Sequence, residues 1–295
     1  TPLFLAVDRG HDQCALYLLE QDVPVDGKDN HGVSPLERCV LMGNFEVAAK
    51  LVGKGASPNQ LLSNSVTLAH VFVSNGVPED SFLSLLSLGI DANTVDSDGS
   101  SVVHLAAAHS DAMYLRLLLE KQADVDVGKA NDDGDTPLHR ACRWGRQENV
   151  DMLLRKGAPI ASRNVREMTS LHYAAMSGST ECCQLLVDRS ADLNAEDKFF
   201  RTPLQVACDH FHFSTAEFLV RAGCEVNLRS PTHGWLLIQV TCAKQPRLLY
   251  SMIRAGAQVE CIHHLEAEID EEPCNTIEEA VERPCFSPII VLRAQ

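Results

Sequence analysis

Arginine and aromatic residues gather in the middle of a chain that is otherwise acidic. Residues 136–168 hold seven basic and three acidic side chains, a balance of +4, whereas the formal net charge of all 295 residues is −15. Arginine, tryptophan and tyrosine often anchor protein–protein interfaces, and a basic surface favours an acidic partner. The candidate contact residues in and after this stretch are Arg140, Arg143, Trp144, Arg163, Arg166, Tyr173, Met176, Phe199 and Phe200.

Catalytic chemistry has no comparable candidate. The sequence contains no Gly-x-Ser-x-Gly, no His-Glu-x-x-His, no Walker loop and no Rossmann fingerprint. Its acidic residues stand mostly where turns and helix caps are expected, and a solvated structural role is sufficient for them. We therefore predict a protein that is not an enzyme and has no catalytic residues.

Two groups of cysteine and histidine raise the question of a metal site. Residues 208–212 read Cys-Asp-His-Phe-His, but no second cluster at fixed spacing completes a set of four ligands. The spacing of a second set matches no familiar zinc site, and that set is Cys261, His263, Cys274 and Cys285. We predict no metal and no cofactor.

Residues 136–168 must fold in a way that positions the basic side chains, and their pattern predicts two short helices. Thr136 is a good N-cap, and Pro137 suits the first helical position. A narrow apolar face follows, and Gly145 can end the first helix. The second helix is expected from Gln147 to Gly157. Helices of two or three turns are not stable alone, so this unit needs neighbours.

Copies of the unit supply those neighbours. Equivalent starts are separated by 33, 32, 35, 35, 33, 33 and 33 residues. Strings such as TPLHRA, VDMLLR and ADLNA recur in phase, and together they resemble the ankyrin repeat. The resemblance covers roughly residues 1–262, and the starts fall at Thr1, Ser34, Val66, Ser101, Thr136, Thr169, Thr202 and Trp235.

The resemblance implies an all-α repeat solenoid, an array of helix pairs with β-hairpin-like turns. We expect the array to occupy residues 1–265. The third repeat is degenerate, because Val66-Thr67-Leu68 replaces the usual cap, and it should be a softer point. Residues 266–295 hold eight acids and two arginines, and we expect a partial ninth repeat or a C-terminal cap there. Because Thr1 already stands at a helix cap, the chain is expected to be a fragment of a longer protein.

Family resemblance also assigns roles to particular positions. Positions five, eight and nine of each repeat tend to face the concave groove, and in the fifth repeat they are Arg140, Arg143 and Trp144. Tyr173 and Met176 occupy positions five and eight of the next repeat. The following turns offer Arg163 and Arg166, then Phe199 and Phe200. Two alternatives stay open, because the arginines can simply be solvated and the phenylalanines can pack between adjacent turns.

Histidine and asparagine recur at fixed places in the repeats. His104, His139 and His172 each stand three residues after a cap, where the family uses histidine to bond within the turn. Asn194 and Asn227 stand where the family uses asparagine to bond across the turn. Each has a leucine eight residues earlier, so both also resemble sites that an oxygenase hydroxylates.

The predicted function is that of a non-catalytic protein–protein interaction module. It is expected to act as a scaffold or adaptor whose concave groove binds a partner protein or linear peptide, with an acidic one favoured. The alternatives are the substrate-recognition arm of a multi-subunit ubiquitin ligase, an inhibitor, or the non-catalytic domain of a larger enzyme. Residues 284–295 faintly resemble a ligase-recruiting box.

Composition excludes other classes of partner. The acidic balance argues against nucleic acid, which requires a basic footprint. No run approaches the ~18 apolar residues that a membrane span requires, so no direct membrane insertion is expected. Eleven scattered cysteines favour reduced, buried thiols. We expect a cytoplasmic protein, with the nucleus as the alternative location.

Overall fold

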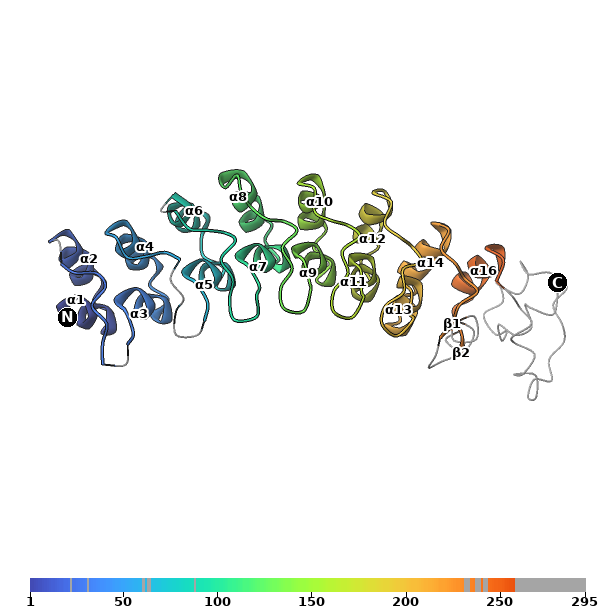
Figure 1. Cartoon of the computed structure of the whole chain (residues 1–295), viewed down its shortest axis with the longest axis horizontal. Helices are drawn as coiled ribbons and strands as arrows, with labels where there is room; N and C mark the ends of the chain where they lie inside the picture. Colours follow the sequence, from blue (N-terminus) through green and yellow to red (C-terminus); the bar gives the residue numbers. More distant parts are fainter. Residues whose placement is uncertain are drawn as a thin grey trace. The chain divides into compact units, whose positions relative to one another are not determined.

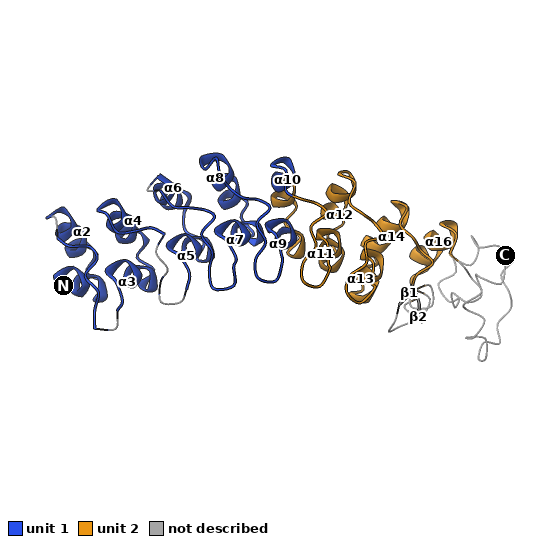
Figure 2. Ribbon diagram, in the orientation of Figure 1, with its two compact units in different colours: residues 1–141, 152–158 blue, residues 142–151, 159–295 orange. Residues whose placement is uncertain are grey.

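The computed structural model describes residues 1–257 except 22, 31, 60, 61, 63, 64, 88, 231–233, 237–239 and 241–243. The chain divides into two compact units, shown in Figure 2. Unit 1 comprises residues 1–141 and 152–158, and unit 2 comprises residues 142–151 and 159–295. The division passes through the fifth helix pair, α9 (Pro137–Arg143) and α10 (Gln147–Arg155).

Unit 1 is a stack of antiparallel helix pairs, each helix seven to nine residues long. The first helices of successive pairs pack against one another, and so do the second helices, which gives the two rows visible in Figure 1. Its remaining helices are α1 (Pro2–Asp8), α2 (Asp12–Glu20), α3 (Pro35–Met42), α4 (Phe45–Gly53), α5 (Leu68–Ser74), α6 (Glu79–Ser87), α7 (Val102–Ala108) and α8 (Met113–Lys121).

Unit 2 continues the same pattern. Arg229 pairs with Trp235 in an antiparallel ribbon of two short strands. Its further elements are α11 (Ser170–Ser177), α12 (Thr180–Val187), α13 (Pro203–Asp209), α14 (Phe213–Arg221), β1 (Arg229–Ser230), β2 (Gly234–Trp235) and α16 (Pro246–Arg254). The predicted class, an all-α solenoid of helix pairs, is therefore confirmed.

Hydroxyl side chains begin most of the first helices. The Ser34 hydroxyl accepts a hydrogen bond from the Glu37 amide at 3.1 Å, and it satisfies one of the free N–H groups of the first turn. At the third repeat the sequence alignment was wrong by one residue. The N-cap is Thr67, which forms a capping box with His70, so this repeat has the same kind of cap as the fourth, where Ser101 pairs with His104.

The histidines at the third helical position join successive repeats. In α7 the His104 Nδ1 accepts from the Ser101 amide at 3.0 Å, while Nε2 faces the Asp135 carbonyl at 3.0 Å. His172 bonds to the Arg201 carbonyl at 2.9 Å in the same way. The prediction that these histidines bond at the cap is confirmed. Burial lowers the pKa of His104 to about 4, so the imidazole is neutral.

Short side chains close the turns between repeats. The Asp96 carboxylate accepts from the Ser100 amide at 2.9 Å, and the Asp197 carboxylate accepts from the Arg201 amide at 2.9 Å. Neighbouring turn tips are joined by a backbone hydrogen bond, from Lys198 N to Arg166 O at 2.9 Å in unit 2. The turns are therefore fixed in a β-hairpin-like form by their own side chains and by each other.

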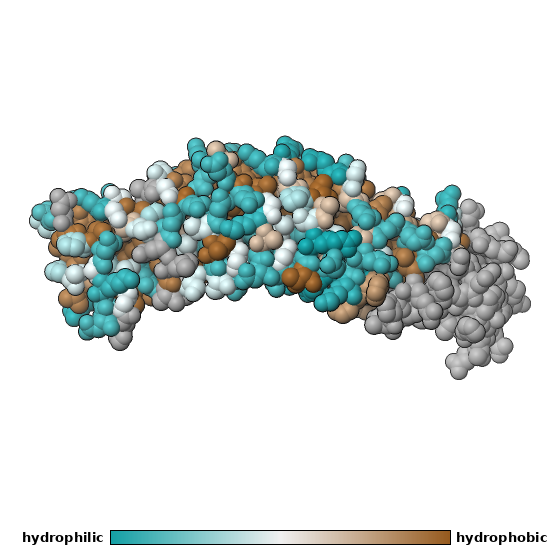
Figure 3. Space-filling model, in the orientation of Figure 1, coloured by the Kyte–Doolittle hydropathy of each residue, from teal (hydrophilic) through white to brown (hydrophobic). Residues whose placement is uncertain are grey.

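Leucine and small side chains fill the space between the two rows of helices. Leu68 and Leu115 are fully buried in unit 1, and Leu186 and Leu204 are fully buried in unit 2. Each contributes about 2 kcal/mol by leaving water. On the face shown in Figure 3, exposed apolar residues form small patches among hydrophilic ones. Most of the apolar surface is therefore buried between stacked repeats.

Candidate partner-binding surface

Tyr173, from α11, is the centre of the candidate surface in unit 2. Its side chain is 0% exposed, which corrects the expectation that its ring itself meets a partner. The Arg143 guanidinium carbon lies 5.7 Å from the ring centroid, and that of Arg166 lies 6.0 Å away. Both distances permit cation–π attraction. The tyrosine is thus a buried support for two exposed arginines.

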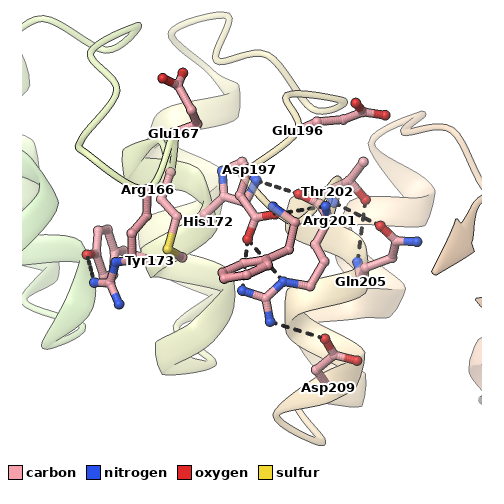
Figure 4. A network of polar contacts seen from close by, with 12 residues as sticks. Arg166, Glu167, His172, Tyr173, Glu196, Asp197, Arg201, Thr202, Gln205 and Asp209 are labelled. Atoms are coloured by element: carbon pink, nitrogen blue, oxygen red, sulfur yellow. Dashed lines mark hydrogen bonds and ion pairs between the residues drawn. The ribbon is translucent and has the colours of Figure 1, made fainter. Parts of the chain in front are cut away.

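The Tyr173 hydroxyl connects this support to the preceding turn. Arg166 Nη2 donates to it at 2.7 Å (Figure 4). Asn164 Nδ2 also donates to it, at 2.9 Å. Asn164 is buried, and its side-chain oxygen also accepts from the Met168 amide at 3.0 Å. A single hydrogen-bonded group therefore fixes the turn, the inner helix and the Arg166 side chain together.

Arg143 and Arg166 differ from Arg163 in the residues that they contact. Arg163 donates to the Glu196 carbonyl at 2.8 Å and forms an ion pair with Glu167 at 3.7 Å. Neither Arg143 nor Arg166 forms an ion pair with any residue that the structure describes. Arg163 therefore connects adjacent turns, while the side-chain contacts that the structure describes for Arg143 and Arg166 are with Tyr173.

The next turn displays the two phenylalanines. Phe199 and Phe200 are 59% and 66% exposed, so they do not pack between turns. The Arg201 guanidinium lies 5.3 Å from the Phe199 ring and binds the buried Asp197 carboxylate through two nitrogens, at 2.8 and 3.0 Å (Figure 4). Asp209 lies 3.6 Å from the same guanidinium. These contacts hold the tip rigid beneath its exposed rings.

The remaining predicted contact residues lie at different depths. Trp144 is 56% exposed and directly follows Arg143. Met176 is half-buried. Arg140 belongs to unit 1, where its Nη2 donates to the Ser100 hydroxyl at 3.3 Å. The other eight predicted residues all belong to unit 2.

Several exposed apolar side chains were missed by sequence reasoning. Val165 lies in the same turn as Arg166, and Phe211 lies in the loop after α13. In unit 1 the exposed Leu5, Leu41 and Met42 occupy positions five, eight and nine counted from the caps of their repeats. Applying the position rule to every repeat would have found these three, whereas nothing local in the sequence marks Phe211.

The two asparagines hold successive turns together. The Asn194 side-chain oxygen accepts from the Glu225 amide at 2.8 Å, and Asn227 Nδ2 donates to the Gly256 carbonyl at 3.1 Å. Asn194 is exposed and Asn227 is half-buried. The family role of this asparagine is thus seen directly, and hydroxylation of either residue stays a prediction.

Other chemistry is sparse in the described part of the chain. Within residues 1–257 as described, no group of three histidine, cysteine or acidic side chains is placed to hold a metal ion. The set Cys261, His263, Cys274 and Cys285, and the whole segment 266–295, lie outside the described residues. Among the described helices, none has the length and apolar character that crossing a bilayer requires.

Comparison with known proteins places the chain in a family. The ankyrin-repeat family model (three copies) matches residues 1–61, 69–164 and 158–230. The human transient receptor potential channel A1 is 30% identical in an alignment 190 residues long, which covers 51% of this chain and 17% of the channel. The Arabidopsis thaliana E3 ubiquitin-protein ligase KEG is 26% identical over 276 residues, covering 77% of this chain and 17% of the ligase.

A solved structure agrees with the sequence matches. The crystal structure of the ankyrin repeat domain of Bcl-3 superposes with a TM-score of 0.62 at 26% identity, and it covers 76% of this chain and 99% of that domain. The chain spans about a sixth of the length of the channel and of the ligase. Repeats of this kind serve as protein–protein interaction modules. The chain belongs to the ankyrin-repeat family.

Proposed function

We propose that unit 2 binds an acidic linear segment of a partner protein. The contact surface, called here the arginine–aromatic surface, consists of Arg143, Trp144, Arg166, Phe199 and Phe200. The observation that carries the proposal is the pair of arginines held on one buried tyrosine. Both charges lack a carboxylate among the described residues, and both are oriented by the ring beneath them.

Physical complementarity supports this type of partner. Two fixed guanidinium groups attract carboxylates, and they lose little side-chain entropy on binding because they are already ordered. Exposed aromatic rings beside them offer a place for one large apolar side chain. The acidic body of the chain repels the rest of an acidic partner, which favours binding at a basic surface such as this one. The association rate should fall as salt is added.

Its biochemical role, we propose, is that of a non-catalytic scaffold or adaptor. Rigid caps and turn bonds keep the surface in one conformation, which favours display rather than chemistry. Buried, protonated thiols such as Cys39, whose pKa burial raises to about 12, suit a reducing compartment. We therefore place the protein in the cytoplasm, with the nucleus as the alternative.

A second candidate is the substrate-recognition arm of a ubiquitin ligase, or more generally the non-catalytic domain of a larger enzyme. The likeness to an E3 ubiquitin-protein ligase over 77% of this chain favours it. Copurification of elongin and cullin proteins with the full-length gene product would support this candidate. Their absence, with other partners recovered, would favour the scaffold.

The test is a peptide-display screen of cytosolic disordered segments with three baits. They are the wild type, the double variant Arg143→Glu/Trp144→Ala, and the control Arg189→Glu, which changes an exposed arginine outside the surface. We expect acidic peptides with one large apolar residue to enrich on the wild type and the control and to vanish on the double variant. Far-UV circular dichroism and melting should not change.

Two outcomes would contradict the proposal. Equal enrichment on all three baits would show that peptides bind elsewhere on the chain. Loss of binding together with loss of the folded signal would show that Arg143 and Trp144 stabilise the repeat rather than contact a partner.

A further inference from the structure

A second concave site lies between α14 and α16, the second helices of two neighbouring pairs in unit 2. The two helices pack against each other and leave a groove of about 600 Å³. Three arginines line it, Arg221, Arg247 and Arg254, together with Tyr250 and Glu217. None of these residues belongs to the arginine–aromatic surface, so the groove needs its own explanation.

The groove is positively charged on an acidic protein. The described residues that line it include three arginines and one glutamate, a surplus of two positive charges, whereas the chain as a whole has a net charge of −15. Glu217 binds Arg221 at 2.5 Å as an i,i+4 pair, and Arg221 stays largely exposed. Such a pair is weak, so Arg221 can turn toward a stronger anion at little cost.

The other two arginines have no competing carboxylate among the residues that the structure describes. Neither Arg247 nor Arg254 forms an ion pair with a residue that the structure describes. The Arg254 guanidinium carbon lies 5.6 Å from the Tyr250 ring centroid, a distance that permits cation–π attraction. Among the described residues, no carboxylate therefore neutralises either charge, and both side chains line the same cavity.

The ligand that best fits this site carries two charges in a small volume. A phosphate monoester has a charge of about −1.5 to −2 at neutral pH, close to the surplus of the groove. The planar guanidinium matches phosphate oxygens with two parallel hydrogen bonds. Val220, Ala255 and the Tyr250 ring form an apolar wall that suits a side chain next to the phosphorylated residue.

The overall charge decides between sources of phosphate. An anionic membrane or a nucleic acid would bring many negative charges against the acidic body of the protein. A linear peptide brings one phosphate into the groove and little charge elsewhere. We propose that the groove between α14 and α16 is a second binding site, which takes a phosphorylated linear segment of a partner protein.

The experiment measures fluorescence anisotropy on the full chain. The probe is a fluorescein-labelled, degenerate peptide pool with a fixed central phosphoserine, and the same pool without phosphate is the reference. Vesicles containing phosphatidylserine and phosphoinositide test the membrane. The variants are Arg247→Gln and Arg254→Gln, and the matched control is Arg189→Gln, an exposed arginine outside the groove.

We expect the phosphorylated pool to bind more tightly than the reference. Each groove variant should weaken it about tenfold, because a hydrogen bond to a charged group contributes on the order of one factor of ten. Arg189→Gln and the double variant Arg143→Glu/Trp144→Ala should leave it unchanged. The second of these controls separates this site from the proposed function, since each can fail without the other.

Three results would overturn the proposal. The first is equal binding of the phosphorylated and unphosphorylated pools, and the second is binding of vesicles with no binding of peptides. The third concerns the chain's own acidic run, residues 266–272. If peptide binds only after the five acids of that run are neutralised, the occupant of the groove in the native protein is this run and not a partner.

Discussion

Replacing His104 by glutamine should remove part of the acid sensitivity of unit 1 without removing the helix cap. The imidazole accepts from the Ser101 amide through Nδ1, and Nε2 faces the Asp135 carbonyl of the next repeat. Unit 2 contains the control, because Gln205 occupies the equivalent position. The Gln205 side-chain oxygen accepts from the Thr202 amide at 2.9 Å. Glutamine therefore caps the helix but has no proton to gain.

The size of the effect comes from the pKa of the imidazole. Burial lowers the pKa of His104 from 6.5 to about 4. Below pH 6.5 the unfolded chain binds a proton that the folded chain does not, so the free energy of unfolding falls until the pH reaches about 4. Across that whole window the loss is about 3 kcal/mol, and between pH 7.5 and pH 5 it is about 2 kcal/mol.

Urea unfolding followed by far-UV circular dichroism measures this loss. Wild type and His104→Gln are compared at pH 7.5 and at pH 5. We expect the variant to cost less than about 1 kcal/mol at pH 7.5, the typical size of one exchanged hydrogen bond. From pH 7.5 to pH 5, the free energy of unfolding of the variant should fall by about 2 kcal/mol less than that of the wild type. Burial also lowers the pKa of His70 and His172, so the variant should keep some acid sensitivity.

The reasoning would be refuted by identical pH dependence in the two proteins. That result would mean that His104 gains its proton near pH 6.5 in the folded state as well. A direct check is the imidazole titration by nuclear magnetic resonance. A His104 signal that shifts between pH 6 and 7 would show that the cap tolerates the charged ring.

Three further predictions concern unit 2. Phe200→Gly should be more stable than Phe200→Ala by about 0.5–1 kcal/mol in thermal melting, since Phe200 has a φ of 58° and only glycine adopts it without strain; equal stability would contradict this. Arg201→Met should cost about 2–3 kcal/mol in urea unfolding, because it leaves the buried Asp197 carboxylate without its cation, whereas a neutral outcome would show that the turn amides suffice. For hydroxylation, mass spectrometry of protein from cells should find an added oxygen on Asn194 before Asn227, since Asn194 is the more exposed; the reverse order would refute the argument from exposure.

Much of the fold could be predicted because its chemistry is local. A hydroxyl cap followed by proline begins a helix within four residues, and the same pattern returns at a period near 33. The third repeat shows how the prediction of a helix cap from aligned strings can fail. Val66 resembles a degenerate cap when strings are aligned by their leucines. Thr67 with His70 three residues later was the better signal, since that pair defines the capping box.

The candidate surface was less predictable, because burial depends on contacts between repeats. Tyr173 was assigned to the groove by its position, yet its hydroxyl is held from below by Asn164 and its ring is covered by two arginines. Arg163 and Arg166 look equivalent in the sequence. One binds the Glu196 carbonyl of the next turn and the other lies on the tyrosine. Only the three-dimensional stacking of turns separates these roles.

The turn tips contain one further sign of where contacts are made. The described turn tips are five residues long, such as residues 164–168 and 197–201. The fourth residue of each has a positive φ, a conformation that costs an ordinary residue about 1–2 kcal/mol. Unit 2 has side chains at this position in two adjacent tips, Glu167 at φ 58° and Phe200 at φ 58°. The residues at this position in unit 1 are Gly32, Gly99 and Gly134, with Ser65 in a fourth tip.

An exposed phenylalanine in that conformation has two unfavourable contributions to stability: the strain of its backbone and the exposure of its apolar ring to water. Neither cost is offset by burial in the tip itself, because Phe200 is two-thirds exposed. The Phe199 and Arg201 amides donate to the Asp197 carboxylate, and these bonds hold the conformation regardless of the side chain at position 200. The ring is therefore dispensable for the turn, and contact with a partner is the role that would account for its presence.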